Sequence, residues 1–422
     1  MIPGGRLKMG ERLSRKRTGF LIFLCWLAYM SAYIGRLNYS ASLIRIVSEL
    51  GISRAKGGIV ASFFFFAYGA GQLVHGILSR HYNLRWSIPI SMFFSAVWNL
   101  LMPFCSTVAP MKYLWLLNGF TQSVLWSSLI RALGLYLSEQ DLKQAVWVMS
   151  TTTGVGTVLA YGISAFLMRF STWRASFWLA SVVLLSVGLI WFWGYGGIQK
   201  STAAAERTQE RQPVHGKKKK SPAFLLAFGV ILLFAILNNL IKDGLTTWTP
   251  SILYELYGLP ETLSVLLTLG LPLLAICGSF LCVRLSSRIR DHVMLCCVFY
   301  GISFAAVGIL ILFLPAGIWP LTLGCFALSS LAMAAVNNVI TSLMPLQLRT
   351  EADCGRTAGI ANAFCYIGST ISSYALGAMA DQCGWNGVFY LLLGLTALAL
   401  VVCGIYYPLS RRLMLDKAGK IC

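Results

Sequence analysis

Residues 20–43, FLIFLCWLAYMSAYIGRLNYSASL, decide the fold class of this chain. The stretch is aliphatic and aromatic throughout and carries a single charged residue, Arg36. About 20 apolar residues in an α-helix are enough to cross the hydrocarbon core of a bilayer. Because lipid offers no hydrogen-bond partner to the backbone, such a stretch must be helical. The sequence therefore predicts a membrane-spanning helix with one cation inside it.

The same kind of stretch recurs along the whole chain. Of 422 residues, 57% are hydrophobic and only 11% are charged, and the mean hydropathy is +0.72. A soluble domain has about a quarter of its residues charged, so a soluble fold is excluded. The apolar stretches fall approximately at residues 19–42, 56–79, 87–106, 111–137, 144–168, 174–197, 222–247, 262–284, 292–314, 318–344, 354–379 and 387–408. We predict an all-α membrane protein with twelve transmembrane helices.

One polar segment divides these helices into two sets of six. Residues 199–221 contain the basic cluster at 217–220 and have the composition of a solvated linker. The apolar segment after it, residues 224–253, resembles residues 20–43 and carries its own cation, Lys242, about two-thirds along. Internal repeats of this kind are typical of transporters. We predict two pseudo-symmetric six-helix bundles, residues 1–198 and 222–422, joined by a cytoplasmic linker at 199–221.

The distribution of Lys and Arg predicts the orientation in the bilayer. Of the 34 Lys and Arg residues, 26 fall on the side that holds both termini and the linker, six fall on the other side, and two lie within helices. Cytoplasmic loops carry the excess of such residues, so both termini are predicted to be cytoplasmic in a multi-pass protein of the cell membrane. We therefore attribute the formal charge of +20 to the Lys and Arg residues of the cytoplasmic side, and we expect no nucleic-acid partner.

Reactive side chains show no enzyme-like arrangement in the sequence. The twelve Cys residues are scattered and have no CxxC spacing, which indicates neither a disulfide framework nor a zinc site. No nucleophile with a matching base and no cluster of metal ligands is apparent. We therefore expect no enzyme activity, no cofactor and no metal.

Arg36 and Lys242 are the residues that point to function. A cation at mid-helix costs about 2.5–3.5 kcal/mol on insertion scales, so each should face protein, water or an anion. Two such cations, one from each half, would suit an anionic solute, and Arg can bind phosphate through two parallel hydrogen bonds. The alternative for Lys242 is a buried ion pair with its neighbour Asp243.

Proton coupling has little support in the sequence. Asp243 is the one carboxylate within the predicted membrane core, and His75 lies among glycines, where a packing role is the expectation. Exchange of one anion for another requires no proton-carrying group. The amides Asn238 and Asn239 in the seventh predicted helix could line the pathway or form interhelical hydrogen bonds.

Five segments, in order along the chain, carry a resemblance to a known family: residues 33–40 (YIGRLNYS), 76–85 (GILSRHYNLR), 151–156 (TTTGVG), 242–250 (KDGLTTWTP) and 355–385. Together they resemble the organophosphate:phosphate antiporters of the major facilitator superfamily, the branch with the glycerol-3-phosphate and hexose-phosphate transporters. The segment at 355–385 is the most specific. The resemblance implies two bundles that rock about a central site and exchange an organic phosphate for inorganic phosphate, and we expect a monomer.

The resemblance also implies roles for individual residues. Arg36 and Lys242 take the places of two substrate-binding arginines, and Tyr33 and Tyr366 match pocket tyrosines. The remaining candidates are Asn38, Thr151 and Asn239 for substrate binding, and Arg80, Arg85 and Arg131 for a gating or cytoplasmic-loop role.

Four positions depart from the family's pattern. Lys242 stands in place of an arginine, Thr151 in place of a histidine, and Arg80 in place of an acidic residue. Asp243 adds a negative charge where a phosphate would come close. Two alternatives therefore stay open. The chain could transport a different anion, such as a carboxylate, or it could be a transporter-like membrane sensor of sugar phosphates.

Overall fold

Long helices account for nearly all of the chain in the computed structural model, which describes residues 14–78, 81–201, 222–289, 291–344 and 354–418. The helices before the linker are α1 (Arg15–Ala41), α2 (Leu43–Leu50), α3 (Arg54–Leu78), α4 (Leu84–Leu101), η2 (Met102–Phe104), α5 (Val108–Tyr136), α6 (Glu139–Phe170) and α7 (Trp173–Ser201). Those after it are α8 (Pro222–Tyr257), α9 (Glu261–Leu267), α10 (Gly270–Ser286), α11 (His292–Phe313), η3 (Leu314–Ala316), α12 (Trp319–Asn338), η4 (Val339–Leu343) and α14 (Cys354–Ala418).

The predicted all-α membrane fold is confirmed. Within the described residues, ten segments are long and apolar enough to cross a membrane. The last of them, Thr357–Pro408, is 52 residues long and contains two of the predicted spans. α5 is not among the ten although it has 29 residues, because buried polar side chains such as Asn118 and Gln122 lower its hydropathy.

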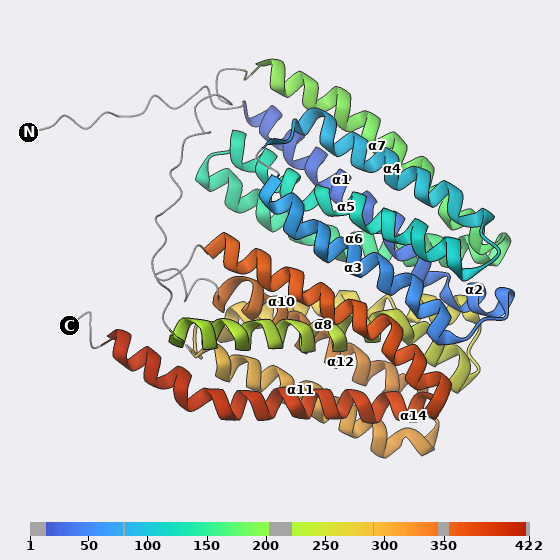
Figure 1. The fold of residues 1–422 in the computed structure, drawn as a ribbon, viewed down its shortest axis with the longest axis vertical. Coiled ribbons are helices and arrows are strands. Elements are labelled where there is room, and N and C mark those ends of the chain that lie inside the picture. The colour runs from blue at the N-terminus through green and yellow to red at the C-terminus, as the bar shows by residue number, and fades with distance from the viewer. Residues whose placement is uncertain (1–13, 79–80, 202–221, 290, 345–353, 419–422) are drawn as a thin grey trace, which may run out of the picture.

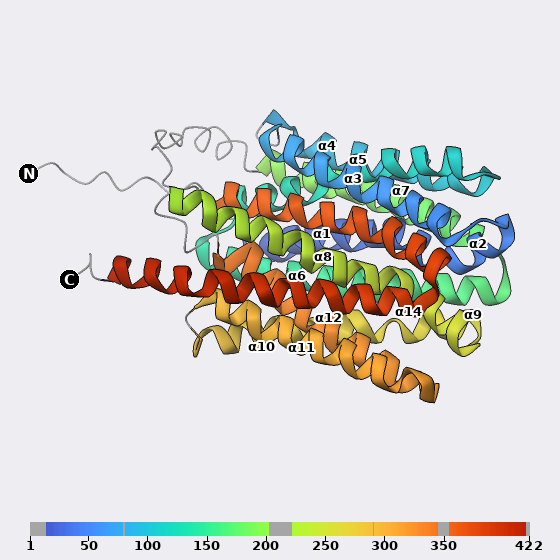
Figure 2. The same cartoon turned by 60° about the horizontal axis from the view of Figure 1, so that its bottom comes forward.

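α14 is two helices joined at a sharp break. Gly384 has φ 68° and ψ −177°, a backbone conformation that only glycine adopts readily. Figures 1 and 2 show the chain reversing direction at this point, so that the two parts of α14 run antiparallel. The sequence predicted separate helices at 354–379 and 387–408, and the break falls between them.

The helices before and after the predicted linker occupy different parts of the molecule. In Figure 1, α1 to α7 lie in the upper part and α8 to α14 in the lower part. We call these the N-half and the C-half. α1 begins, α7 ends, α8 begins and α14 ends on one side of the molecule, the left of Figure 1. We call this the terminal end, and the opposite end the distal end.

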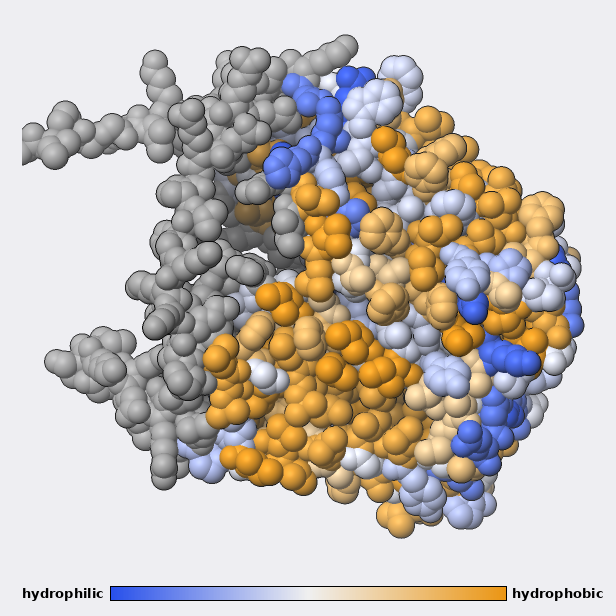
Figure 3. Space-filling view, in the orientation of Figure 1, coloured by the Kyte–Doolittle hydropathy of each residue, from blue (hydrophilic) through white to orange (hydrophobic). Residues whose placement is uncertain are grey.

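The surface has the distribution of polarity that a bilayer requires. Hydrophobic side chains cover the broad middle of the face shown in Figure 3, and hydrophilic ones gather towards the distal end. Large apolar residues such as Phe66, Leu312 and Ile405 are more than half exposed. Exposed apolar surface of this extent would aggregate in water, whereas it matches the hydrocarbon of a membrane.

α3 of the N-half and the first part of α14 of the C-half pack closely together. Ser62 donates a hydrogen bond to the carbonyl of Thr370. A Cβ on Gly58 would lie 2.0 Å from the carbonyl oxygen of Ser373, so only glycine permits this approach. Nearer the terminal end, Asn362 donates to Gln72 over 2.6 Å. These contacts hold α3 of the N-half against α14 of the C-half.

Candidate functional site

Arg36 lies in the interior on α1 and is only 6% exposed. Aromatic rings surround its guanidinium group. The distance from the guanidinium carbon to the ring centre is 4.2 Å for Tyr33, 4.8 Å for Tyr68, 5.9 Å for Phe64 and 6.0 Å for Tyr29. Such cation–π contacts stabilise a cation withdrawn from water by about 0.5–2 kcal/mol each. We call these four rings the aromatic cage.

Helical periodicity assembles this cage. Tyr29, Tyr33 and Arg36 are four and three residues apart on α1, so they share one face of that helix. Phe64 and Tyr68 are one turn apart on α3 and stack on each other with ring centres 5.8 Å apart. The cage forms where these two faces meet.

The guanidinium edge of Arg36 has no acceptor. Its Nε and Nη2 atoms are buried and make no hydrogen bond within the described part of the chain. A buried charged donor without a partner is costly. The same edge can donate two parallel hydrogen bonds to two oxygens of a phosphate or carboxylate. This edge of Arg36 is therefore a candidate for binding an anion.

The cation of the C-half is paired. Nζ of Lys242 lies 3.4 Å from Oδ1 of Asp243, and the two side chains are 27% and 19% exposed. Oδ2 of Asp243 accepts hydrogen bonds from Asn239 at 3.1 Å and from Ser369 at 2.5 Å. Asn239 also donates to Ser369 at 3.2 Å. The carboxylate is therefore fixed between α8 and α14.

Two tyrosines connect Arg36 with this ion pair. Tyr366 on α14 packs against Tyr68 with ring centres 4.7 Å apart, and it is close enough to both Arg36 and Asp243 to interact electrostatically. Tyr33 is similarly close to Lys242, and its hydroxyl accepts a hydrogen bond from Thr153 on α6 at 3.0 Å. Residues from both halves thus form one cluster, which we call the central cluster. Its members are Tyr29, Tyr33, Arg36, Phe64, Tyr68, Asn239, Lys242, Asp243, Tyr366 and Ser369.

Two of the other candidates for substrate binding make contacts within the N-half. Asn38 is 1% exposed and donates to Asn99 on α4 at 2.8 Å, so its side chain ties α1 to α4. Thr151 accepts a hydrogen bond from the indole of Trp26 at 2.9 Å and so ties α6 to α1. Neither residue is among those that surround the Arg36 guanidinium.

Two of the arginines predicted for a gating or cytoplasmic-loop role contact other residues of the N-half. The guanidinium of Arg85 lies over the Phe192 ring at 4.6 Å. Nη1 of Arg131 donates to the carbonyl of Tyr82 at 2.8 Å. Arg80 lies outside the described residues.

Sequence reasoning missed several members of the central cluster. Tyr29, Phe64 and Tyr68 were not singled out, and neither was Ser369. The spacing of Tyr29, Tyr33 and Arg36 is a signal that could have identified the first. Tyr68 and Ser369 could not be found in this way, because their positions depend on how α3 and α14 pack against α1 and α8.

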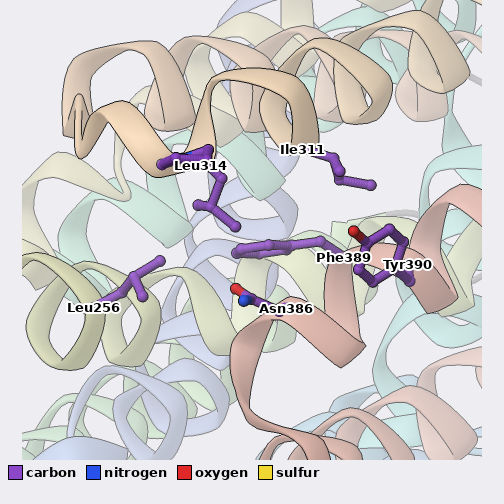
Figure 4. Close-up of a pocket in the computed structure, with 7 residues that line it drawn as sticks. Leu256, Ile311, Leu314, Asn386, Phe389 and Tyr390 are labelled. Atoms are coloured by element: carbon purple, nitrogen blue, oxygen red, sulfur yellow. The ribbon is translucent and has the colours of Figure 1, made fainter.

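A separate pocket lies at the distal end, away from the central cluster. It has a volume of about 420 Å³. Figure 4 shows the side chains around it, which come from α8, α11, η3 and α14: Leu256, Ile311, Leu314, Pro315, Asn386, Phe389 and Tyr390. The lining has no charged group, so this pocket does not suit an anion. No group of three or more His, Cys, Asp or Glu that could hold a metal occurs in the part of the chain that the structure describes.

Comparisons with known proteins agree with this architecture. Residues 25–352 and 276–420 match the model of the Major Facilitator Superfamily. Among solved structures, a bacterial homologue of the human lysosomal transporter Spinster has a TM-score of 0.74 at 14% identity and covers 95% of this chain and 98% of its own. The nucleoside transporter NupG has a TM-score of 0.68, also at 14% identity, with 92% and 99% covered.

Curated relatives match over nearly the full length. The glycerol-3-phosphate transporter of Bacillus subtilis is 24% identical, with 94% of each chain covered. The probable hexose phosphate transport protein of Chlamydia pneumoniae is 21% identical, with 90% of this chain and 89% of the relative covered. The membrane sensor protein UhpC of Escherichia coli is 22% identical, with 90% and 91% covered.

The chain belongs to the major facilitator superfamily. It is a membrane transporter of that superfamily and not an enzyme. The resemblance to organophosphate transporters seen in the sequence is confirmed by these relatives.

Proposed function

We propose that this transporter carries a phosphorylated or other small organic anion by alternating access, in exchange for inorganic phosphate. The observation that carries the proposal is the buried Nε and Nη2 edge of Arg36, which has no acceptor among the described residues. Phosphate offers two oxygens that match this edge. The names of the relatives, which include a glycerol-3-phosphate transporter and a hexose phosphate transport protein, support the same substrate class.

In this proposal the anion binds in the central cluster between the two halves. The six-helix bundles at residues 1–198 and 222–422 rock about the site, with the segment at 199–221 as their linker. Without an anion, the unpaired charge of Arg36 opposes closure of the site. The transporter therefore exchanges one anion for another more readily than it releases one and returns empty. It acts as a monomer in the cell membrane, with both termini in the cytoplasm.

The test is exchange of labelled inorganic phosphate into proteoliposomes preloaded with phosphate. We expect the native protein to exchange phosphate, Arg36→Ala to abolish exchange, and Arg36→Lys to retain a small fraction, because Lys keeps the charge but loses the two parallel hydrogen bonds. Arg169→Ala is the matched control, since Arg169 also lies near a ring, that of Phe170, but at the distal end of α6. Exchange by Arg36→Ala at the native rate would contradict the proposal.

Two other results would redirect it. If the native protein exchanges no phosphate, the same assay with labelled small carboxylates tests the carboxylate alternative. If phosphate esters bind but nothing is exchanged, a sensor function gains support, as the similarity to the sensor UhpC allows. Either result would remove phosphate exchange as the function.

A further inference from the structure

Asp243 holds an exceptional position among the acidic residues. It lies within the membrane-spanning part of α8. The other Asp and Glu residues in the described part of the chain lie near the ends of helices or at the break in α14. A carboxylate inside a membrane helix is costly and is usually functional.

The charges of the central cluster do not balance. Lys242 and Asp243 form an ion pair, so together they contribute no net charge. Arg36 contributes one positive charge, and its guanidinium edge has no acceptor. Among the charged side chains that the structure describes in this cluster, the sum is therefore one positive charge and not two.

Asp243 cannot easily withdraw from an incoming anion. Its Oδ2 atom is held by Asn239 and Ser369, and its Oδ1 atom faces Lys242. Rotating the carboxylate away would break these bonds and leave Lys242 without its counter-ion. A second negative charge on the substrate would therefore meet a fixed carboxylate, and like charges repel strongly where water is scarce.

We infer that Asp243 makes the site selective for the charge of its substrate: an anionic group with one negative charge is preferred to one with two. The chemistry is that of a phosphodiester or of a singly ionised phosphate monoester. This inference rests on the proposed function, because it concerns the same site.

The test is direct binding to the purified full-length chain at pH 8. One probe is glycerophosphoglycerol, a phosphodiester with a single charge. The other is glycerol phosphate, a monoester that is mainly doubly charged at pH 8, because its second ionisation has a pKa near 6. We expect the native protein to bind the diester at least about tenfold more tightly than the monoester.

Asp243→Asn should move the ratio of the two dissociation constants towards the monoester by at least about tenfold, because it exposes the charge of Lys242. The change in the ratio is the decisive quantity, since the difference in size between the probes is the same for every variant. Asp291→Asn is the matched control. It removes the same charge at the N-cap of α11, where Asn also caps well, and should leave the ratio unchanged.

A double variant keeps the inference testable if Asp243→Asn does not fold. Lys242→Gln with Asp243→Asn again leaves the single charge of Arg36, and should restore the native preference for the diester. A native preference for the doubly charged monoester, or an unchanged ratio in a folded Asp243→Asn protein, would overturn the inference alone. Binding of both probes by Arg36→Ala with native affinity would instead overturn the proposed function.

Discussion

At the scale of single residues, the contact between Arg36 and the aromatic cage explains how a buried guanidinium can remain available to a ligand. The Tyr33 ring centre lies 4.2 Å from the guanidinium carbon of Arg36, a distance at which the ring face attracts the cation electrostatically. Such contacts do not consume the in-plane N–H donors. Nε and Nη2 of Arg36 accordingly remain without acceptors. The cage stabilises the charge and leaves these N–H donors available to the proposed anion.

Tyr68 tests the role of the cage. Tyr68→Phe keeps a ring at this position and should leave the substrate concentration for half-maximal exchange within about twofold of native. Tyr68→Ala removes one cation–π contact and should raise that concentration by roughly 2- to 30-fold, which corresponds to about 0.5–2 kcal/mol. The measurement is the concentration dependence of phosphate exchange in proteoliposomes. Equal effects of Phe and Ala would show that the hydroxyl, and not the ring, matters.

At the scale of the helices, the break at Gly384 lets the two parts of α14 run antiparallel, so that this segment can cross the membrane twice. Its φ of 68° with ψ of −177° lies in a region that residues with a Cβ avoid. A side chain here would not clash with neighbouring atoms, because a Cβ placed on Gly384 would meet nothing within 4 Å. Backbone strain alone therefore decides what a substitution there costs.

Gly384→Ala should destabilise the protein by about 1–3 kcal/mol, the cost of a residue other than glycine in this conformation. Gly394→Ala is the control in the same helix. A Cβ there also meets nothing within 4 Å, and the backbone is helical, so we expect no loss and a gain of up to about 1 kcal/mol. Thermal unfolding in detergent measures both. A native melting temperature for Gly384→Ala would show that the chain can turn here in another way.

At the scale of the whole molecule, Arg54 connects the two halves at the distal end. It begins α3, and its guanidinium group contacts Glu255 on α8 and Asp381 on α14 at 2.5 Å and 3.3 Å. The Asp381 carboxylate also accepts the backbone N–H groups of Arg54 and Ala55, so a residue of the C-half caps a helix of the N-half. Trp385 adds a hydrogen bond to Glu255. Opening of the distal end, which the proposed alternating-access cycle requires, would break these contacts.

Arg54→Gln should favour conformations in which the distal end is open. The measurement is the distance distribution between spin labels at Phe104 and Ile318, which are 73% and 48% exposed near the distal end of the N-half and the C-half. The labels require a background from which the natural cysteines have been removed. We expect the population of longer distances to increase in the variant. The effect is limited because the partners are about a quarter to a third exposed, and partly solvated ion pairs contribute little each.

Arg174→Gln is the matched control for this prediction. Arg174 on α7 pairs with Glu49 on α2 at 2.6 Å, so it is an ion pair of the same kind within a single half. Its loss should leave the distance distribution unchanged. An equal shift in both variants would mean that the change reflects general loosening and not release of the contact between the halves.

The sequence by itself determined the class of fold and the cations at the centre of the candidate site. Hydrophobic stretches of membrane length depend only on local composition, and a charge inside such a stretch is visible because the bilayer makes it costly. For that reason Arg36 and Lys242 could be singled out from the sequence, and the break between the last two helices could be predicted from the gap between the apolar stretches at 354–379 and 387–408. The contact of Lys242 with Asp243, left open as an alternative, is present in the structure.

Only the tertiary structure decided which side chains surround these cations. Tyr68 and Ser369 lie on different helices from Arg36 and Asp243, so their contacts depend on how α3 and α14 pack, and no local pattern encodes that packing. The same holds for Asn38, which lies two residues after Arg36 yet bonds to α4, because successive residues of a helix face different directions. Composition selects the helices and their buried charges, whereas the packing of distant helices determines the partners of each charge.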